Sequence, residues 1–168
     1  DNTQNMLEQL KLRDEEARML GFKNYAALSL APWLMFLGWS TYVTGNGSIK
    51  AGWSAVSCAL LGVPLGIGGA LFLGGIAAAL GPFALMLVVF LLAGFAVLST
   101  LTPPLNSPVG WFLGLLGYFG SQMKPEVASL YPVMAPILIG AISGWVAGLV
   151  AAKIAAAGSA SAPAPSAP

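Results

Sequence analysis

The sequence contains no histidine and only one cysteine. Without histidine, a His-ligated zinc or haem, a Ser-His-Asp triad and a histidine proton relay are all excluded. Cys58 has no second cysteine with which to form a disulfide within the chain, and we interpret it as a small buried apolar residue. We therefore expect no metal site in this chain.

Charge is also scarce. Only 8% of the residues are charged and 57% are hydrophobic, whereas about 25% of the residues of a soluble domain are charged. No charged residue occurs anywhere from Ala51 to Met123. Such a stretch is stable when hydrocarbon surrounds it and helices satisfy its backbone hydrogen bonds, so the sequence predicts an all-α polytopic membrane protein. The net charge of +1 provides no basic surface for nucleic acid.

Prolines, glycines and polar turns divide the membrane part, residues 25–153, into about three full transmembrane helices and two short ones. The full spans are predicted over 52–80, 83–101 and 130–152. The short helices are predicted over 32–44, after an interruption of the first apolar piece at Pro32, and over 108–121. Each short helix would be about 18–21 Å long, less than the hydrocarbon core of about 30 Å.

The short helices could either enter the membrane and return or cross it fully. Re-entrant helices would place Lys23, Lys50 and Lys124 on one side, which the positive-inside rule makes cytoplasmic. Full crossings would place Lys50 on the opposite side. The shortness of both pieces favours the re-entrant arrangement.

Two segments of different composition flank the membrane part. Residues 1–24 mix leucines and methionines with charges of both signs. This pattern predicts a short amphipathic helix that ends near Gly21 and lies on the membrane surface or against a partner. Residues 154–168 are rich in Ala, Pro and Ser, and we expect this low-complexity tail to become ordered only on a partner surface.

The two short helices share a sequence pattern in which Pro, Phe-Leu-Gly and Tyr recur at one constant offset. Residues of the first copy match residues of the second in chain order: Pro32, Phe36, Leu37, Gly38 and Tyr42 match Pro108, Phe112, Leu113, Gly114 and Tyr118. Short or broken helices in corresponding places of two halves are typical of duplicated membrane proteins. The pattern therefore predicts an internally duplicated arrangement.

The same stretches carry a resemblance to a known family. The segment 36–42, FLGWSTY, is followed by a Gly-rich turn and Lys50, and the second half contributes 108–119. Over residues 29–153 the chain resembles the small bacterial inner-membrane proteins known as domain of unknown function 1097. The resemblance implies a duplicated bundle, and it implies neither an activity nor catalytic residues. Members of the family usually begin with a full apolar span, and here the charged segment 1–24 stands in that place.

Small residues form a stripe on two of the predicted spans. Residues at a spacing of four lie on one face of a helix, and small side chains let membrane helices approach closely. We therefore predict helix-packing faces, and the alternative is a solute path lined by bare backbone. The stripes consist of Gly62, Gly66 and Ala70 in the second apolar piece and Gly140, Gly144 and Gly148 in the last.

No arrangement of residues for catalysis is present, so we do not expect an enzyme. No Asp, Glu, Lys or Arg falls within an apolar span, which removes the usual marker of an ion or proton pathway. The sequence also lacks a nucleophile elbow, a phosphate-binding loop and a dinucleotide-binding fingerprint.

Two functional hypotheses remain. The first is a non-catalytic subunit of a larger membrane assembly of photosynthetic or respiratory type, docked through its Gly-rich helix faces and terminal tails. Its partners would be other membrane subunits and lipid, and chlorophyll or carotenoid would have to be held without His ligands. The second is a passive channel or facilitator for a small neutral solute, with Ser40, Thr41, Ser121 and Gln122 as polar contacts. Either would reside in a bacterial inner membrane or a thylakoid-type membrane.

Overall fold

Helices make up almost the whole architecture. The computed structural model describes residues 2–21, 23–45 and 48–160, and none of these residues lies in a strand. The all-α prediction is confirmed. In chain order the elements are α1 (Asn2–Met19), α2 (Tyr25–Val43), α3 (Ile49–Leu80), α4 (Phe83–Leu98), the 3₁₀ turn η1 (Ser99–Leu101), α5 (Pro108–Ser121), the 3₁₀ turn η2 (Val127–Ser129) and α6 (Leu130–Ala160).

Three helices are long and apolar enough to cross a membrane. They cover Ile49–Leu80, Phe83–Leu101 and Val127–Ala157. These are the three spans that the sequence predicts, so the assignment as an integral membrane protein is confirmed. The last helix is longer than predicted, because it continues through Pro136 and on to Ala160 instead of ending at 152. It thereby takes up the first part of the predicted tail 154–168, and residues 161–168 lie outside the described part of the chain.

The helix predicted over 32–44 is wrong at its start. Pro32 lies inside α2, which is one helix of 19 residues from Tyr25 to Val43. A proline removes only one backbone donor, whereas a helix break in hydrocarbon would leave several backbone groups without partners. The full helix is about 28 Å long, close to the thickness of the hydrocarbon core. α5 has the predicted bounds, with Pro108 in its first turn and Ser107 as its N-cap.

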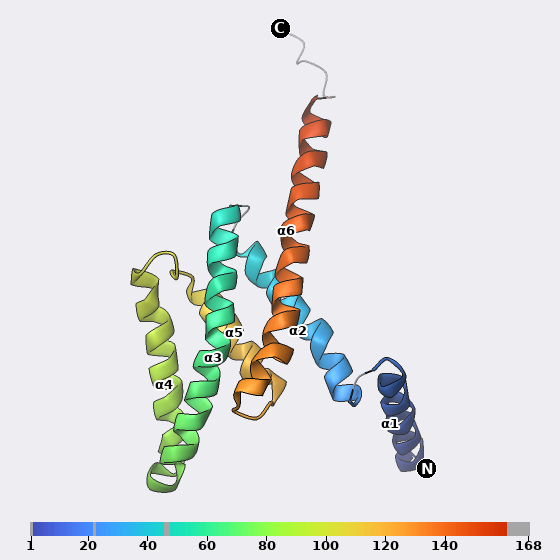
Figure 1. Ribbon diagram of the computed structural model, residues 1–168, viewed down its shortest axis with the longest axis vertical. Helices are drawn as coiled ribbons and strands as arrows, with labels where there is room; N and C mark the ends of the chain where they lie inside the picture. Colours follow the sequence, from blue (N-terminus) through green and yellow to red (C-terminus); the bar gives the residue numbers. More distant parts are fainter. Residues whose placement is uncertain (1, 22, 46–47, 161–168) are drawn as a thin grey trace.

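The helices alternate in direction through the bundle (Figure 1). α2 and α6 run from the end that carries α1 towards the other end, whereas α3 and α5 run the opposite way. α4 returns beside α3 after a turn at Gly81, whose φ is +53°. α2 and α5 each lead from one end of the bundle towards the other. Lys50 in the first turn of α3 therefore lies at the opposite end of the bundle from the start of α2 and the end of α5, which is the placement that full crossings predict. Whether the short helices re-enter or cross the membrane stays a prediction.

An apolar core lies where α2, α3, α5 and α6 meet. Its buried members are Leu34, Leu37, Val63, Ile67, Tyr118, Val133 and Ile137. A smaller cluster of Cys58, Ala96 and Trp111 joins α4 to α3 and α5. Cys58 is fully buried, as predicted. Among the described residues the buried polar side chains are Thr41 and Ser129, and no charged side chain is buried.

α1 lies outside this bundle, next to the start of α2 (Figure 1). It ends before Gly21, whose φ of +83° terminates the helix as the sequence predicts. The Arg13 guanidinium lies 5.2 Å from the centre of the Tyr25 ring. The Asp14 carboxylate accepts the Tyr25 N–H at 3.4 Å and pairs with Arg18 at 3.0 Å. Location on a membrane surface or a partner stays a prediction.

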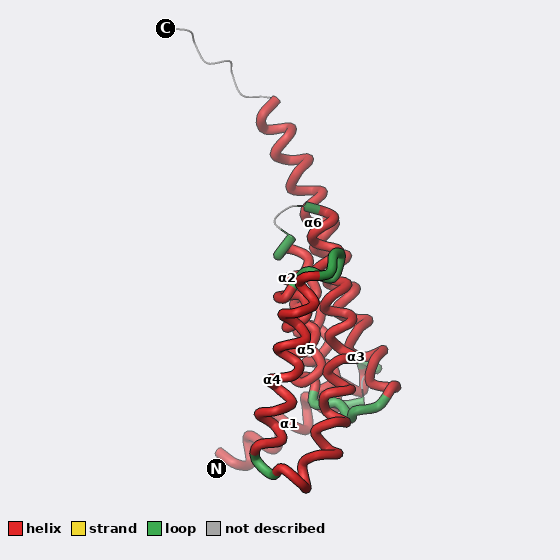
Figure 2. The backbone as a smooth tube through the Cα atoms, turned by 90° about the vertical axis from the view of Figure 1, so that its left-hand side faces the viewer, coloured by secondary structure: helices red, strands yellow, loops and turns green. Residues whose placement is uncertain are grey.

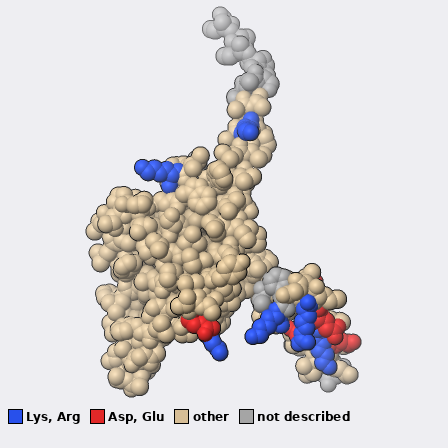
Figure 3. Space-filling view, viewed as in Figure 1, with Lys and Arg blue, Asp and Glu red and all other residues tan. Residues whose placement is uncertain are grey.

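Charged side chains are found at the two ends of the bundle and on α1, with a broad uncharged surface between them (Figure 3). Figure 2 shows that α6 extends beyond the other helices towards its C-terminal end. The end of the bundle that lies away from α1 carries two basic residues, Lys50 in the first turn of α3 and Lys153 near the end of α6. The end next to α1 carries more of them, namely Lys11, Arg13, Arg18, Lys23 and Lys124.

This asymmetry predicts that α1 lies in the cytoplasm and that the end of α6 lies on the opposite face, because cytoplasmic segments are enriched in Lys and Arg. The measurement is labelling of single cysteines by a membrane-impermeant maleimide in sealed right-side-out vesicles of a Cys58→Ala variant. Ala155→Cys should react in intact vesicles, and Gln4→Cys only after lysis. Reaction of both positions from the same side would contradict the topology.

Candidate functional site

The backbones of α2 and α6 touch where the two helices cross. A Cβ atom added at Gly38 would collide with the carbonyl oxygen of Ile137. In the same way, a Cβ at Gly140 would collide with the carbonyl oxygen of Met35. One turn further along α6, a Cβ added at Gly144 would lie 3.4 Å from the Cβ of Tyr42. Only glycine permits this approach, so the crossing depends on both residues.

α5 crosses α3 with the same set of contacts. A Cβ at Gly114 would collide with the carbonyl oxygen of Ala59. A Cβ at Gly62 would lie 2.7 Å from the carbonyl oxygen of Trp111. Again one turn further along, a Cβ at Gly66 would lie 2.7 Å from the ring of Tyr118. In the first crossing, Gly38 and Tyr42 of the repeat motif thus pack on the α6 stripe that contains Gly140 and Gly144. In the second, Gly114 and Tyr118 pack on the α3 stripe that contains Gly62 and Gly66. The two crossings are built alike.

Four of the six stripe residues therefore contact another helix closely. Ala70 is half-buried against the apolar core. A Cβ added at Gly148 would have no atom of the described residues within 4 Å, because α2 ends before it reaches that level. Five stripe residues thus pack against other parts of the bundle, and Gly148 continues the stripe without a neighbour among the described residues.

The other residues of the repeat motif have different environments. Leu37 is buried, and Leu113 is half-buried against the same core. Phe36 and Phe112 are 60% and 44% exposed, so both phenylalanines face outwards. Pro32 and Pro108 are also exposed. The motif therefore combines an inner Leu-Gly-Tyr contact surface with an outer aromatic surface.

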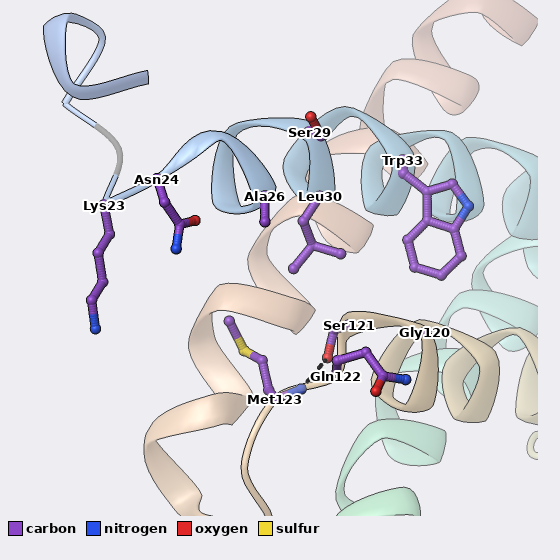
Figure 4. A pocket seen from close by; sticks show the side chains of 10 residues that line it. All are labelled: Lys23, Asn24, Ala26, Ser29, Leu30, Trp33, Gly120, Ser121, Gln122 and Met123. Atoms are coloured by element: carbon purple, nitrogen blue, oxygen red, sulfur yellow. Dashed lines mark hydrogen bonds between the residues drawn. The ribbon is translucent and has the colours of Figure 1, made fainter. Parts of the chain in front are cut away.

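The structure does not bring the four predicted solute contacts together. Ser40 and Thr41 lie in the last turn of α2, whereas Ser121 and Gln122 end α5 and line a cavity beside Trp33 (Figure 4). The apolar core of α2, α3, α5 and α6 separates the two pairs. A single polar path through these four residues is therefore not present.

Three of these polar side chains are already bonded within their own segment. Thr41 is buried and donates to the Leu37 carbonyl at 2.7 Å. Ser121 donates to the Tyr118 carbonyl at 2.6 Å, and the Gln122 amide donates to the Phe119 carbonyl at 2.8 Å. Such local bonds satisfy polar groups in a membrane helix without any solute.

An aromatic cluster that the sequence did not predict occupies the opposite end of the bundle. The Trp53 ring lies 5.8 Å from that of Tyr42 and 6.2 Å from that of Trp145. The indole N–H of Trp145 is buried and has no hydrogen-bond partner among the described residues. The sequence signal for the cluster is weak, because its members come from three helices.

The described part of the chain brings no set of metal ligands together. Its His, Cys, Asp and Glu residues form no group of three or more that could hold a metal ion. The three apolar spans and the glycine crossings define a polytopic helical membrane protein.

The particular family follows from comparison with known proteins. The chain belongs to the family described as Protein of unknown function (DUF1097), whose model matches residues 19–152. The resemblance found in the sequence is thus confirmed. No curated protein and no solved structure matches the chain.

The crossing of α2 and α6 yields a stability prediction. Gly140→Ala should destabilise the protein by about 1–3 kcal/mol, because the added methyl group overlaps the Met35 carbonyl and forces the helices apart. Gly148→Ala is the matched control, since it lies two turns further along the same stripe and has empty space around it. The midpoint of thermal unfolding in detergent measures both. An equal effect of the two substitutions would show that the crossing is not a tight contact.

Proposed function

We propose that the chain is a non-catalytic subunit of a larger membrane assembly, with photosynthetic and respiratory complexes as the candidate hosts. The observation that carries this proposal is a set of glycines on membrane helices at which a would-be Cβ has no atom of the described residues within 4 Å. These are Gly68, Gly74 and Gly75 on α3, Gly94 on α4 and Gly148 on α6. Inside the bundle, by contrast, the space beside Gly38, Gly62, Gly114 and Gly140 is occupied by the backbone of a neighbouring helix.

The physical argument rests on how membrane helices associate. Lipid gives them no hydrophobic reason to pack, so contacts form where small residues let backbones approach. Gly68 and Gly75 are seven residues apart and share one side of α3, with Leu71 and Phe72 exposed between them. The glycines leave shallow grooves on this side of α3 and the exposed Leu71 and Phe72 form ridges, so a helix of another subunit could pack against them. On α6, Gly148 continues a stripe whose first two glycines already hold α2.

The chemistry of the spans supports a structural role. The three apolar spans contain no ionisable residue that could move a proton or an ion through the membrane core, since Lys50 and Lys153 lie near helix ends. The apolar core holds no buried charge either. A subunit that seals or joins other chains needs contact surfaces rather than such groups.

A second function, a passive facilitator for a small neutral solute, is favoured by one separate observation. The α2–α6 and α5–α3 pairs share their glycine contacts and run in opposite directions. We infer that the two halves are an internally duplicated, inverted pair, an arrangement common among transporters. The apolar core would have to open for a solute to pass, because it fills the middle of the bundle.

The assembly proposal predicts that mild detergent extraction leaves the chain in a complex larger than its monomer on native electrophoresis, with other membrane subunits in the same band. Gly68→Leu and Gly148→Leu should release these partners without lowering the thermal unfolding midpoint, because each fills a space that none of the described residues occupies. Val150→Phe is the control, since it adds volume on the other side of α6. Recovery of only a monomer or a small homo-oligomer would contradict the proposal.

The facilitator proposal predicts a different result. Proteoliposomes of the purified protein should swell faster than empty liposomes in at least one uncharged solute, because solute entry draws water with it. Stopped-flow light scattering over a panel of sugars, polyols and urea measures the rates. Identical rates with and without protein across the panel would exclude this function.

A further inference from the structure

A cavity of about 630 Å³ opens at the α1 end of the bundle, between the start of α2 and the end of α5. Figure 4 shows Leu30 and Trp33 of α2 pointing across it towards the end of α5, where Met123 rises towards α2. Lys23 extends on the same side, just before the helix begins. The position of Lys23 at the start of the first apolar helix places this opening at the level of the lipid headgroups.

The rim of this cavity is polar and carries one positive charge. Lys23 is the single charged residue among the lining residues, and it forms no ion pair with any other residue that the structure describes. Gln122, in the left-handed conformation with a φ of 55°, borders the same cavity from the end of α5, away from Lys23 (Figure 4). The Ser121 hydroxyl is already engaged, since it donates to the Tyr118 carbonyl at 2.6 Å and accepts the Met123 N–H at 3.4 Å. The Gln122 amide is engaged too, since it donates to the Phe119 carbonyl at 2.8 Å. Lys23 is therefore the lining group placed to pair with an anion.

A second cavity of about 480 Å³ continues from the first into the apolar part of the bundle. Leu30 and Met123 line both cavities, so these two side chains form the wall between them. The second cavity lies between α2 and α6 and follows α6 from Tyr131 to Ile139, about 12 Å of helix. No charged residue lines it. The unbranched Met123 side chain can change rotamer, which would open a passage between the two cavities when a ligand binds.

We propose that the two joined cavities bind an anionic amphiphile. Its carboxylate or phosphate headgroup pairs with Lys23, and its hydrocarbon chain passes Leu30 and Met123 to lie between α2 and α6. The direction of the change from polar to apolar matches that of a lipid in the surrounding bilayer. A neutral amphiphile would leave Lys23 without a counter-charge, and a soluble anion would leave the apolar cavity empty. This site is independent of the assembly proposed above.

Two sources supply this chemistry, a free fatty acid and an anionic phospholipid. The experiment uses the full chain in nanodiscs of phosphatidylcholine, with photoreactive palmitate, phosphatidylglycerol or monoacylglycerol that carries a diazirine in the acyl chain. Labelled peptides are identified by mass spectrometry. Palmitate or phosphatidylglycerol should label the segments around Leu30, Met123 and Ala135, and the stronger of the two identifies the source. The uncharged monoacylglycerol should label these segments weakly.

Substitutions at the two ends of the site test each half of the proposal. Lys23→Gln should lower the affinity for the anionic probe about tenfold, the size expected for the loss of a hydrogen bond to a charged group. Lys50→Gln, a lysine of the opposite end that lines another cavity, should leave it unchanged. Ala135→Leu should reduce labelling by filling the apolar cavity, whereas Ala147→Leu on the exposed part of α6 should not.

Three results would overturn the proposal. They are labelling spread over exposed helices such as α4, equal labelling by the neutral probe, and undiminished affinity in Lys23→Gln. Circular dichroism and the unfolding midpoint are measured for every variant. Lys23 lies outside the helices, so its substitution tests the site even where Ala135→Leu lowers stability.

Discussion

Where α2 crosses α6 and where α5 crosses α3, backbone meets backbone, and the arrangement of the whole bundle follows from these two contacts. Each uses glycines on both helices: Gly38 and Gly140 in one, Gly62 and Gly114 in the other. In hydrocarbon, apolar side chains gain little by leaving lipid, so close van der Waals contact of backbones is one of the few forces that hold helices together. The contacts also connect the two halves of the chain, because α2 packs on the last helix and α5 on the third. Neither half forms its main contact within itself.

Much of this fold could be predicted from sequence, because its strongest constraint is the absence of charge. The uncharged run from Ala51 to Met123 predicts the second and third apolar pieces, and the stripes containing Gly62 and Gly140 predict packing faces that the structure uses. The predicted start of a helix at Pro32 is wrong, because the rule that proline breaks helices was applied to a segment inside the membrane. Pro32 does not begin a helix, because hydrocarbon cannot satisfy the backbone groups that a break would expose.

The candidate site was less predictable, because its members come from separate segments. The sequence indicates Ser121 and Gln122 as polar contacts, but a common path with Ser40 and Thr41 is wrong, because the helix directions place the two pairs apart. No pattern in the sequence marks Lys23 and Met123 as members of a site, since a lysine before an apolar helix and a methionine after one are ordinary features. Only the packing of α2 beside the end of α5 shows that they share a cavity. The two ends of the bundle consequently differ: one has a basic amphiphilic cavity, and the other has a cluster of tyrosine and tryptophan rings.

The length of α3 has a mechanical consequence. Its 32 residues would extend about 48 Å, well beyond a hydrocarbon core of about 30 Å, and inclination to the bilayer normal is one way for the helix to fit. A thicker bilayer would let it stand more upright, and a thinner one would lay it flatter. Because Gly62 and Gly66 fix α5 to the middle of α3, a change of inclination is passed directly to α5. Membrane thickness thus becomes a variable that acts on the end of α5, where Ser121 and Gln122 border the amphiphilic cavity.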